Sequence, residues 1–289
     1  MPSFHDRLRE RRPLILDGAT GTELSRRGVD LSHPSWTAGA ILEQPEILAE
    51  IHRDYVEAGA ELITANTFRT HRRNLAEMTP QPDPRELTLQ AIRIAREATN
   101  GRALIAGSIA PLEDCYSPQL TPENSSLLRE HREMAEHLAE ADVDVILIET
   151  QVTIREAATA AQAAAGTGLP FLVSFVLNRE GRLLSGETLE AACAEVIPFE
   201  PSGLLVNCLP PGEVARAGET LLRVCGDLPI GAYANTGRLL PDGTWEATEG
   251  VEPAVYAGFA RGWWNSGMKL IGGCCGTTPD HISAIRAIL

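Results

Sequence analysis

Two adjacent cysteines stand among glycines near the C-terminal end of the sequence. The segment reads Gly272-Gly273-Cys274-Cys275-Gly276-Thr277-Thr278-Pro279, between an apolar run that predicts a strand and a pattern that predicts a helix. Neighbouring side chains on a strand point to opposite faces, so both thiols reach one point only if the backbone bends. The flanking glycines permit such a bend. Thiolates gathered in this way suit a zinc ion.

A third sulfur is available from Cys208, which follows Asn207 at the end of another apolar run. Structural zinc sites are normally closed by four protein ligands, whereas catalytic sites keep one position open. Three cysteines from two strand ends therefore favour an open site. The alternative is a buried Cys208 beside a pair that packs or forms a strained disulfide. Cys115, Cys193 and Cys225 fall in a loop or in predicted helices, and His281 lies inside the last helix, so none of these is expected to bind metal.

Short apolar runs alternate with helical patterns eight times along the chain. The apolar runs are continuous rather than alternating, as expected of parallel strands covered on both faces. The predicted strands are Pro13–Ala19, Glu61–Thr67, Ala103–Ala110, Val143–Thr150, Pro170–Leu177, Gly203–Leu209, Pro229–Thr236 and Met268–Cys274.

Amphipathic patterns between these strands predict the helices. They are Pro45–Ala58, Pro84–Thr99, Glu123–Ala141, Ile154–Ala165, Thr188–Glu195, Glu213–Val224, Pro253–Asn265 and Pro279–Ile288. Eight strand–helix units predict a single (β/α)8 TIM barrel over residues 1–289. A doubly wound open sheet is the alternative, but it normally carries a glycine-rich phosphate loop that is missing here. The polar stretches Leu31–Gly39, Tyr116–Pro122, Asn178–Glu187 and Arg238–Glu252 are predicted to be loops.

Composition narrows the class of protein. The formal net charge is −14 over 289 residues, which argues against nucleic acid or an anionic membrane as the main partner. No apolar run approaches the roughly 20 residues of a membrane span. The segment Met1–Arg12 is charged, lacks the apolar core of a signal peptide and predicts a short helix. Six cysteines without such a signal predict a cytoplasmic protein with free thiols.

Polar or sulfur-bearing residues stand at the end of every predicted strand. One such residue is ordinary turn chemistry, but eight sets at the mouth of one barrel predict an active site. Glu149 could act as a general base or bind a cationic group of the substrate. The strand ends carry Asp17-Gly18, Asn66-Thr67, Ser108, Glu149-Thr150, Ser174, Asn207-Cys208, Asn235-Thr236 and Cys274-Cys275.

These motifs together resemble the homocysteine S-methyltransferase family. The resemblance covers the chain from about Leu14 onward and is carried by five segments: Asp17-Gly18-Ala19-Thr20-Gly21-Thr22, Ala65-Asn66-Thr67-Phe68, Glu149-Thr150, Val206-Asn207-Cys208 and Gly272-Gly273-Cys274-Cys275-Gly276. The family includes betaine–homocysteine methyltransferases and the homocysteine module of cobalamin-dependent methionine synthase.

The resemblance implies a (β/α)8 barrel in which Cys208, Cys274 and Cys275 hold Zn²⁺ and homocysteine supplies the fourth sulfur. Asp17 and Glu149 would then lie at the amino-acid end of homocysteine, whose carboxylate would meet the backbone N–H groups of Gly18–Thr20. The substrate-binding residues implied in this way are Asp17, Gly18, Ala19, Asn66, Thr67, Glu149, Asn207 and Asn235.

The methyl donor is expected to be small, because the sequence shows no corrinoid or folate module. S-methylmethionine is favoured, with Trp36 and Trp245 predicted to form a lid that faces its sulfonium cation, while Tyr233 is expected only to pack. Against this, Gly276 and the following Thr-Thr-Pro-Asp-His resemble the methionine synthase module, which favours methyl transfer from a separate corrinoid protein. A non-catalytic barrel that senses zinc or thiols is a further alternative.

Overall fold

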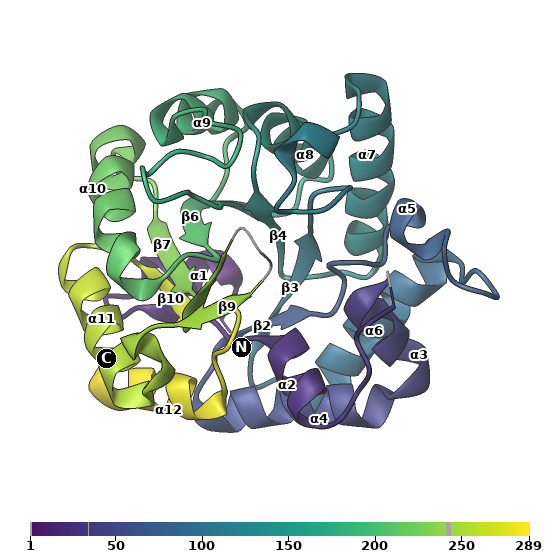
Figure 1. The fold of residues 1–289 in the computed structure, drawn as a ribbon, viewed down its shortest axis with the longest axis horizontal. Helices are drawn as coiled ribbons and strands as arrows, with labels where there is room; N and C mark the ends of the chain where they lie inside the picture. The colour runs from purple at the N-terminus through teal and green to yellow at the C-terminus, as the bar shows by residue number, and fades with distance from the viewer. Residues whose placement is uncertain (1, 34, 241–243) are drawn as a thin grey trace.

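A closed barrel of eight parallel strands forms the centre of the molecule and is ringed by helices (Figure 1). The structure, a computed structural model, describes residues 2–33, 35–240 and 244–289. The strands pair in the order β1-β10-β7-β6-β5-β4-β3-β2, and a parallel bridge between Leu16 and Leu62 joins the two ends. They are β1 Leu14–Ile15, β2 Leu62–Ala65, β3 Leu104–Ile109, β4 Val145–Gln151, β5 Phe171–Phe175, β6 Gly203–Asn207, β7 Ile230–Ala234 and β10 Leu270–Gly273.

One long helix follows each barrel strand and packs on its outer face, as the sequence predicts. Apolar side chains of these helices and of the outward strand faces form the largest core cluster. The (β/α)8 architecture is therefore confirmed. The helices are α4 Pro45–Ala58, α6 Pro84–Thr99, α7 Asn124–Glu140, α8 Ile154–Ala165, α9 Leu189–Val196, α10 Val214–Cys225, α11 Pro253–Asn265 and α12 Pro279–Ile288.

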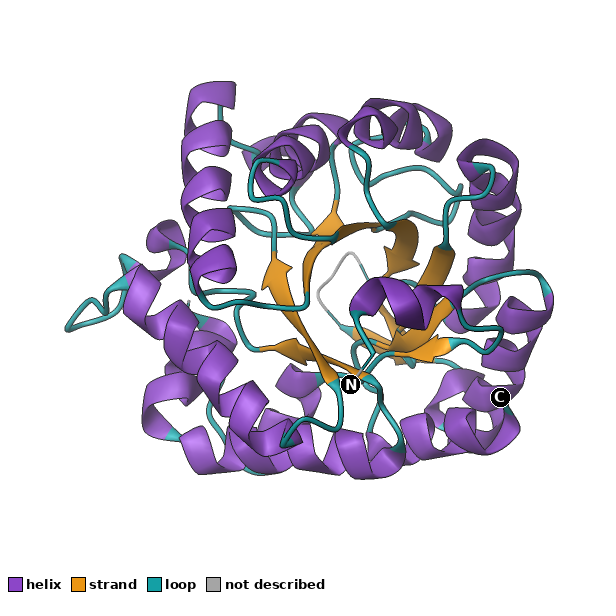
Figure 2. Cartoon of the chain, turned by 180° about the vertical axis from the view of Figure 1, so that it is seen from behind, coloured by secondary structure: helices purple, strands orange, loops and turns teal. Residues whose placement is uncertain are grey.

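A separate apolar cluster fills the inside of the barrel. It includes Leu14, Leu62, Leu104 and Leu172, all almost fully buried. Phe4, on the short N-terminal helix α1 (Phe4–Arg9), packs against this cluster and closes the N-terminal end of the barrel. Figure 2 shows this helix, beside the N mark, lying across that end. Apolar side chains therefore fill the N-terminal end of the barrel, and the polar interior of the described residues lies at the opposite end.

Alternate residues of each strand point into the barrel, and toward the C-terminal end of β3 and β4 these inward residues change from apolar to polar. Leu104 and Ala106 of β3 belong to the interior cluster, and Ser108 is the next residue on that face. Val145 and Leu147 of β4 lead in the same way to Glu149. Alternate residues of a strand share a face. The polar residues at the strand ends thus form the top layer of the barrel interior.

Additional elements lie in stretches where the sequence predicts loops or nothing regular. Within Arg238–Glu252 the chain forms an antiparallel hairpin of β8 (Gly237–Leu239) and β9 (Trp245–Ala247), so the prediction of a plain loop is wrong there. A Cβ on Gly237 would lie 2.4 Å from Trp245 Nε1, so glycine is needed for this pairing. Residues 241–243 of that stretch and Pro34 of the stretch Leu31–Gly39 lie outside the described residues.

The remaining elements are short and mostly lie above the C-terminal ends of the strands. The helices α2, α3 and α5 were not predicted, and the 3-10 turns η1, η2 and η5 fall within predicted loops. The first strand is also shorter than predicted. The short elements are α2 Thr20–Arg26, η1 Trp36–Gly39, α3 Ala40–Glu43, α5 Arg72–Leu75, η2 Pro118–Leu120, η3 Ile197–Phe199, η4 Pro211–Glu213 and η5 Glu249–Val251.

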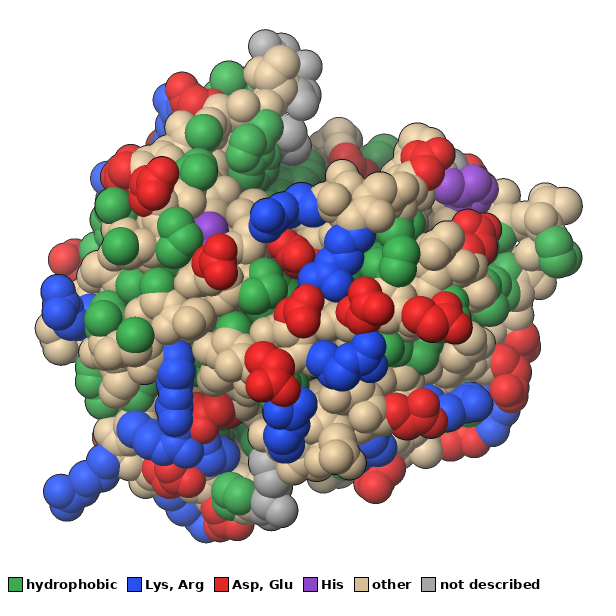
Figure 3. All heavy atoms as spheres, turned by 90° about the horizontal axis from the view of Figure 1, so that it is seen from below, with side chains coloured by type: hydrophobic (Ala, Val, Ile, Leu, Met, Phe, Trp, Pro, Cys, Tyr) green, Lys and Arg blue, Asp and Glu red, His purple; other side chains and the backbone are tan. Residues whose placement is uncertain are grey.

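The surface carries charges of both signs close together. On the face in Figure 3, acidic and basic side chains are interspersed rather than gathered into one large patch. Within the described residues, no helix has both the length and the apolar character needed to cross a membrane. The net negative charge is therefore not gathered into one acidic patch on this face.

Candidate active site

The structure brings together the sulfur atoms of Cys208, Cys274 and Cys275. All three Sγ atoms lie within 4.8 Å of one another, and those of Cys208 and Cys274 are 3.0 Å apart. Cys208 follows β6 and has a φ of 55°, a left-handed conformation that is uncommon for a side chain other than glycine. All three are free, partly buried thiols. This bent backbone turns their side chains toward one another.

A tight turn after β10 aims the cysteine pair. Cys274 N–H still donates to Ala234 O of β7 at 2.7 Å, as in a strand, but Thr277 N–H then donates back to Cys274 O at 3.0 Å. The Thr277 hydroxyl also donates to Cys274 O (2.7 Å) and accepts from Ala19 N–H (3.2 Å). A Cβ on Gly273 would lie 2.3 Å from this hydroxyl. The turn and the loop after β1 therefore hold each other in place.

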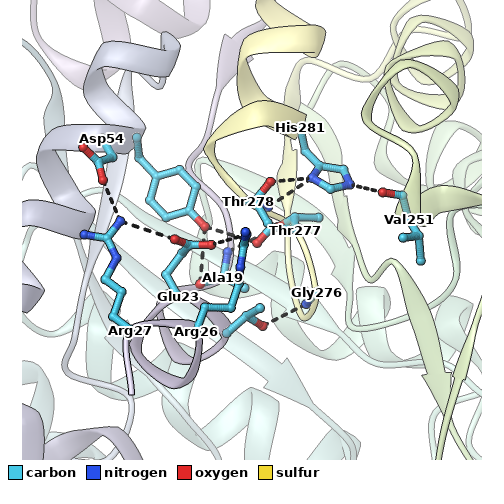
Figure 4. A network of polar contacts seen from close by, with 12 residues as sticks. Ala19, Glu23, Arg26, Arg27, Asp54, Val251, Gly276, Thr277, Thr278 and His281 are labelled. Atoms are coloured by element: carbon cyan, nitrogen blue, oxygen red, sulfur yellow. Dashed lines mark hydrogen bonds and ion pairs between the residues drawn. The ribbon is translucent and has the colours of Figure 1, made fainter. Parts of the chain in front are cut away.

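Contacts on both sides of the turn fix it further (Figure 4). Gly276 N–H donates to Thr22 Oγ1 of α2 at 2.9 Å, and Arg27, which directly follows α2, pairs with Asp54 of α4 at 2.5 Å. On the other side, His281 Nδ1 meets Thr278, while its Nε2 lies 3.1 Å from the carbonyl oxygen of Val251. His281 is buried and ties α12 to η5. As predicted, it belongs to the core, and it lies outside the cysteine cluster.

The glycine after the cysteine pair is required by the backbone. Gly276 has a φ of 84°, where L side chains are rarely found. A Cβ at this position would also lie 1.9 Å from Thr236 Oγ1. The geometry of the turn alone therefore accounts for Gly276.

A cavity of about 410 Å³ opens above the three sulfurs at the C-terminal end of the barrel. The loops after β1, β2 and β3 and the ends of β4, β6, β7 and β10 form its wall. Its lining includes Asp17, Gly18, Ala19, Thr20, Gly21, Thr22, Trp36, Asn66, Phe68, Arg69, Asp114, Cys115, Tyr116, Glu149, Thr150, Cys208, Tyr233, Cys274 and Cys275.

Two buried carboxyl groups lie in this wall. Glu149 accepts hydrogen bonds from Ser108 Oγ at 2.5 Å and Tyr233 Oη at 3.2 Å, so Tyr233 does more than pack. Asp17 accepts from the N–H and hydroxyl of Thr64 at 2.8 and 3.1 Å. Burial raises the pKa of Glu149 to about 7 and that of Asp17 to about 8. Both shifts arise because a buried carboxylate lacks a compensating charge, and a bound cation would supply one.

Asn207, predicted to belong to the substrate site, is fully buried and is not among the residues described as lining the cavity. Its Nδ2 donates to Thr150 Oγ1 at 2.9 Å and to Cys208 Sγ at 3.3 Å. Its Oδ1 accepts from Thr150 N–H at 3.1 Å and from Ser174 Oγ at 2.7 Å. Thr150 and Cys208 both have positive φ angles, 61° and 55°. Asn207 therefore holds two residues with strained backbones in place: Thr150, which follows Glu149, and Cys208 of the thiol cluster.

The other predicted substrate residues separate into two groups. Gly18, Ala19 and Asn66 line the cavity, and Asn66 Nδ2 donates to Thr37 O at 2.8 Å. Thr67 and Asn235 are buried outside the lining. The hydroxyl of Thr67 bonds the backbone of Ser108 on the next strand, which is a structural role.

Aromatic side chains form the outer wall. Trp36 lines the cavity and meets Phe68 edge to face, with ring centroids 5.8 Å apart. A Cβ on Gly21 would lie 2.5 Å from the Trp36 ring, so this glycine lets the indole settle against α2. Trp245 stands on β9, is 43% exposed and is not among the lining residues described, so its part in a lid stays a prediction.

Sequence reasoning missed Arg69 and Tyr116 as wall residues and treated Cys115 as remote. Cys115 lines the cavity but lies outside the cluster of three thiols, and burial raises the pKa of its thiol to about 12. Tyr116 begins the predicted loop Tyr116–Pro122, and its aromatic side chain was the signal in the sequence that this loop could contribute to the cavity wall. Cys193 and Cys225 lie buried in α9 and α10, as expected.

Comparison with known proteins places the chain among methyltransferases. Residues 14–289 match the model of the family described as homocysteine S-methyltransferase. The chain belongs to this family. It is 30% identical to the homocysteine S-methyltransferase YbgG of Bacillus subtilis (strain 168), over 95% of this chain and 93% of the relative. It is also 30% identical to the homocysteine S-methyltransferase of Escherichia coli (strain K12), with 95% and 94% covered.

A solved structure shares the whole fold. The metallated form of the homocysteine methyltransferase MmuM from Escherichia coli superposes with a TM-score of 0.83 at 28% identity, covering 97% of this chain and 99% of that one. The protein is therefore an enzyme, a member of a methyltransferase family, and the alternative of a non-catalytic barrel is set aside.

The raised pKa of Asp17 predicts how stability depends on pH in the ligand-free protein. Between about pH 4 and pH 8 the folded state keeps a proton that the unfolded state has released, so the free energy of unfolding falls as pH rises. Asp17→Asn removes this pH-dependent loss of stability, so its free energy of unfolding should rise relative to that of the wild type by up to about 1.4 kcal/mol per pH unit. Urea unfolding at several pH values should show the variant gaining on the wild type as pH rises. The exposed control Asp280→Asn should follow the wild type; a pH-independent offset for Asp17→Asn would contradict the shift.

Proposed function

We propose that this enzyme transfers a methyl group from a small sulfonium compound, S-methylmethionine first, to the thiol of homocysteine, with Zn²⁺ held by Cys208, Cys274 and Cys275. The observation that carries the proposal is the convergence of three thiols in a cavity whose wall holds two buried carboxyl groups. In the transfer, the homocysteine sulfur bonds to the methyl carbon. The carbon–sulfonium bond breaks, its electrons pass to the departing sulfur, and both products are methionine.

The three thiols fit a zinc ion. Zinc–sulfur bonds of about 2.3 Å in a tetrahedron place sulfur atoms about 3.8 Å apart. The three sulfurs lie within 4.8 Å of one another, and zinc binding would require the Cys208–Cys274 pair to open from 3.0 Å. Three ligands leave the fourth position open, as in catalytic sites. Zinc bound there would supply the means to keep the substrate thiol deprotonated at neutral pH, because a coordinating thiol loses its proton outright. The Nδ2–H of Asn207 would support the set by donating to Cys208 Sγ.

Purified wild-type protein is expected to contain one zinc per chain, measured by elemental analysis. Cys274→Ser should lose it, because a serine hydroxyl at neutral pH is a poor ligand compared with a thiolate. Cys225→Ser, at a buried cysteine outside the cluster, is the matched control and should keep full zinc. A full complement of zinc in Cys274→Ser would contradict the ligand assignment.

The two carboxyl groups suit the ammonium of homocysteine. Glu149 is already oriented by Ser108 and Tyr233, and Asp17 by Thr64, so neither must reorganise to accept a cation. An ammonium between them would favour their charged forms and offset the cost of burying them. The carboxylate of homocysteine would meet the backbone at Gly18–Thr20, which lines the same wall. The amino-acid end would thus be fixed while the thiol reaches the three sulfurs.

Glu149→Gln tests this placement. The variant keeps one acceptor oxygen, for Ser108 or for Tyr233, and presents an NH2 donor in place of the other. It replaces a charged hydrogen bond to the ammonium by a neutral one, at a cost of about 1.5–3 kcal/mol in homocysteine binding. Calorimetry with zinc-loaded protein measures the change, and zinc content should stay at the wild-type level. The exposed Glu123→Gln serves as control. Unchanged homocysteine affinity would remove Glu149 from the substrate site.

The donor side is supported by the aromatic wall. Trp36 and Phe68 present ring surface at the cavity, and such surface attracts a sulfonium cation. The glycine after the cysteine pair, which resembles the methionine synthase module, is weak support for a corrinoid donor. Its φ and its contact with Thr236 require glycine whatever the donor is.

Zinc-loaded enzyme with homocysteine should turn over S-methylmethionine in preference to S-adenosylmethionine, betaine and methylcobalamin. Trp36→Ala should weaken the use of S-methylmethionine by about 1–2 kcal/mol and leave homocysteine binding nearly unchanged. Trp264→Ala removes a tryptophan of α11 that packs near Lys269 and controls for loss of an indole elsewhere. If the enzyme turned over methylcobalamin but no sulfonium compound, the proposed sulfonium donor would be wrong, whereas homocysteine would remain the methyl acceptor.

A further inference from the structure

Arg69 is the one basic side chain among the residues described as lining the cavity. It follows Phe68 in the loop after β2 and is partly buried. Its neighbours along the chain are neutralised: Arg72 pairs with Glu133, and Arg73 pairs with Glu130 and Glu113. Within the described chain, no ion pair is formed by Arg69. The cavity wall therefore contains a cation without a carboxylate partner.

Three contacts hold the Arg69 guanidinium in place, one of them a long hydrogen bond from Nη1 to Asn74 Oδ1 at 3.5 Å. Its Nη1 donates to the carbonyl oxygen of Glu113 at 3.1 Å, across to the loop after β3. Its Cζ lies 5.1 Å from the centroid of the Phe68 ring, which in turn meets Trp36 edge to face. A guanidinium fixed at one nitrogen still has further N–H donors in the same plane, which suits the two oxygens of a carboxylate.

Arg69 is not the counter-ion of the buried carboxyl groups. Glu149 is bonded to Ser108 and Tyr233, and Asp17 to Thr64, whereas Arg69 reaches Glu113 in the loop after β3. Asp114, the acidic lining residue in that loop, accepts from Ser117 and Tyr116. The buried carboxyl groups and the guanidinium thus stand on different parts of the wall.

We propose that Arg69 binds the carboxylate of the methyl donor. The donor would then carry a methyl-bearing cation near Trp36 and Phe68 and a carboxylate at its other end. This inference rests on the proposed function and adds a requirement to it, because a sulfonium without a carboxylate would leave Arg69 unpaired. It also assigns the two carboxylates of the reaction to different places, that of homocysteine to the backbone at Gly18–Thr20 and that of the donor to Arg69.

A cycle of two donors and three proteins tests the assignment. The donors are S-methylmethionine and its α-carboxamide, which keeps the sulfonium and removes the negative charge. Wild type should prefer the acid by about 10- to 100-fold in kcat/KM, the range expected for one charged hydrogen-bonded pair. Arg69→Gln should lose that preference by weakening the acid alone, and Arg69→Lys should keep part of it. Arg73→Gln, at an arginine with carboxylate partners, should retain the wild-type preference.

The outcomes separate the two levels of the proposal. If Arg69→Gln lowers kcat/KM equally for both donors, Arg69 only staples the loops after β2 and β3, and its assignment falls. If Arg69→Gln raises the KM of homocysteine instead, Arg69 binds the carboxylate of homocysteine rather than that of the donor, and the assignment also falls. In both cases turnover of a sulfonium by the wild type leaves the proposed function standing. Failure of every sulfonium donor with the wild type would reject the proposed function together with this assignment.

Discussion

Bringing three sulfur atoms to one point is the constraint on which the rest of the site depends. Thiols from β6 and β10 meet within 4.8 Å only because the backbone bends sharply after both strands. These bends are held by hydrogen bonds from neighbouring loops rather than by the strands: Thr277 links the β10 turn to the loop after β1, and Asn207 links Cys208 to Thr150. A buried amide with all its partners in place costs little and fixes one geometry. The rigid barrel beneath keeps the two strand ends in register.

The second constraint is electrostatic. Asp17 and Glu149 are buried with hydroxyl and N–H partners but without a cation, so burial raises the pKa of both. This arrangement costs free energy in the empty cavity, and a ligand that brings an ammonium recovers it. Arg69, on another part of the wall, forms no ion pair within the described residues and is held by the carbonyl oxygen of Glu113. A site that leaves charges of both signs unpaired on different walls is complementary to zwitterions, since each end of an amino acid would meet the opposite charge.

The barrel was predictable because its signals are local and repeated. Apolar runs alternate with amphipathic helices, and the period of two carries the interior face to Ser108 and Glu149 at the strand ends. The direction of side chains beyond a strand end was not predictable. Asn207 stands in a motif with Cys208, yet the bend that turns the thiol inward leaves the amide fully buried, outside the residues described as lining the cavity. Arg69 and Tyr116 lie in loops whose path depends on contacts with distant segments. The β8–β9 hairpin likewise depends on a glycine that makes room for Trp245.

Neighbouring residues of one sequence motif can therefore be required for different reasons, some by the backbone and others by the chemistry of the site. Gly276 adjoins the cysteine pair, but its positive φ and its contact with Thr236 explain it without reference to any donor. In the proposed function, the donor would be selected by Trp36, Phe68 and Arg69, which stand in the loops after β1 and β2. There Gly21 makes room for Trp36, Trp36 meets Phe68, and Phe68 underlies Arg69. Each contact in this series orients the next. In the proposed function, the thiol acceptor would thus depend on the strand ends and the methyl donor on the loops, so that one barrel could keep the cysteine cluster while its donor changes.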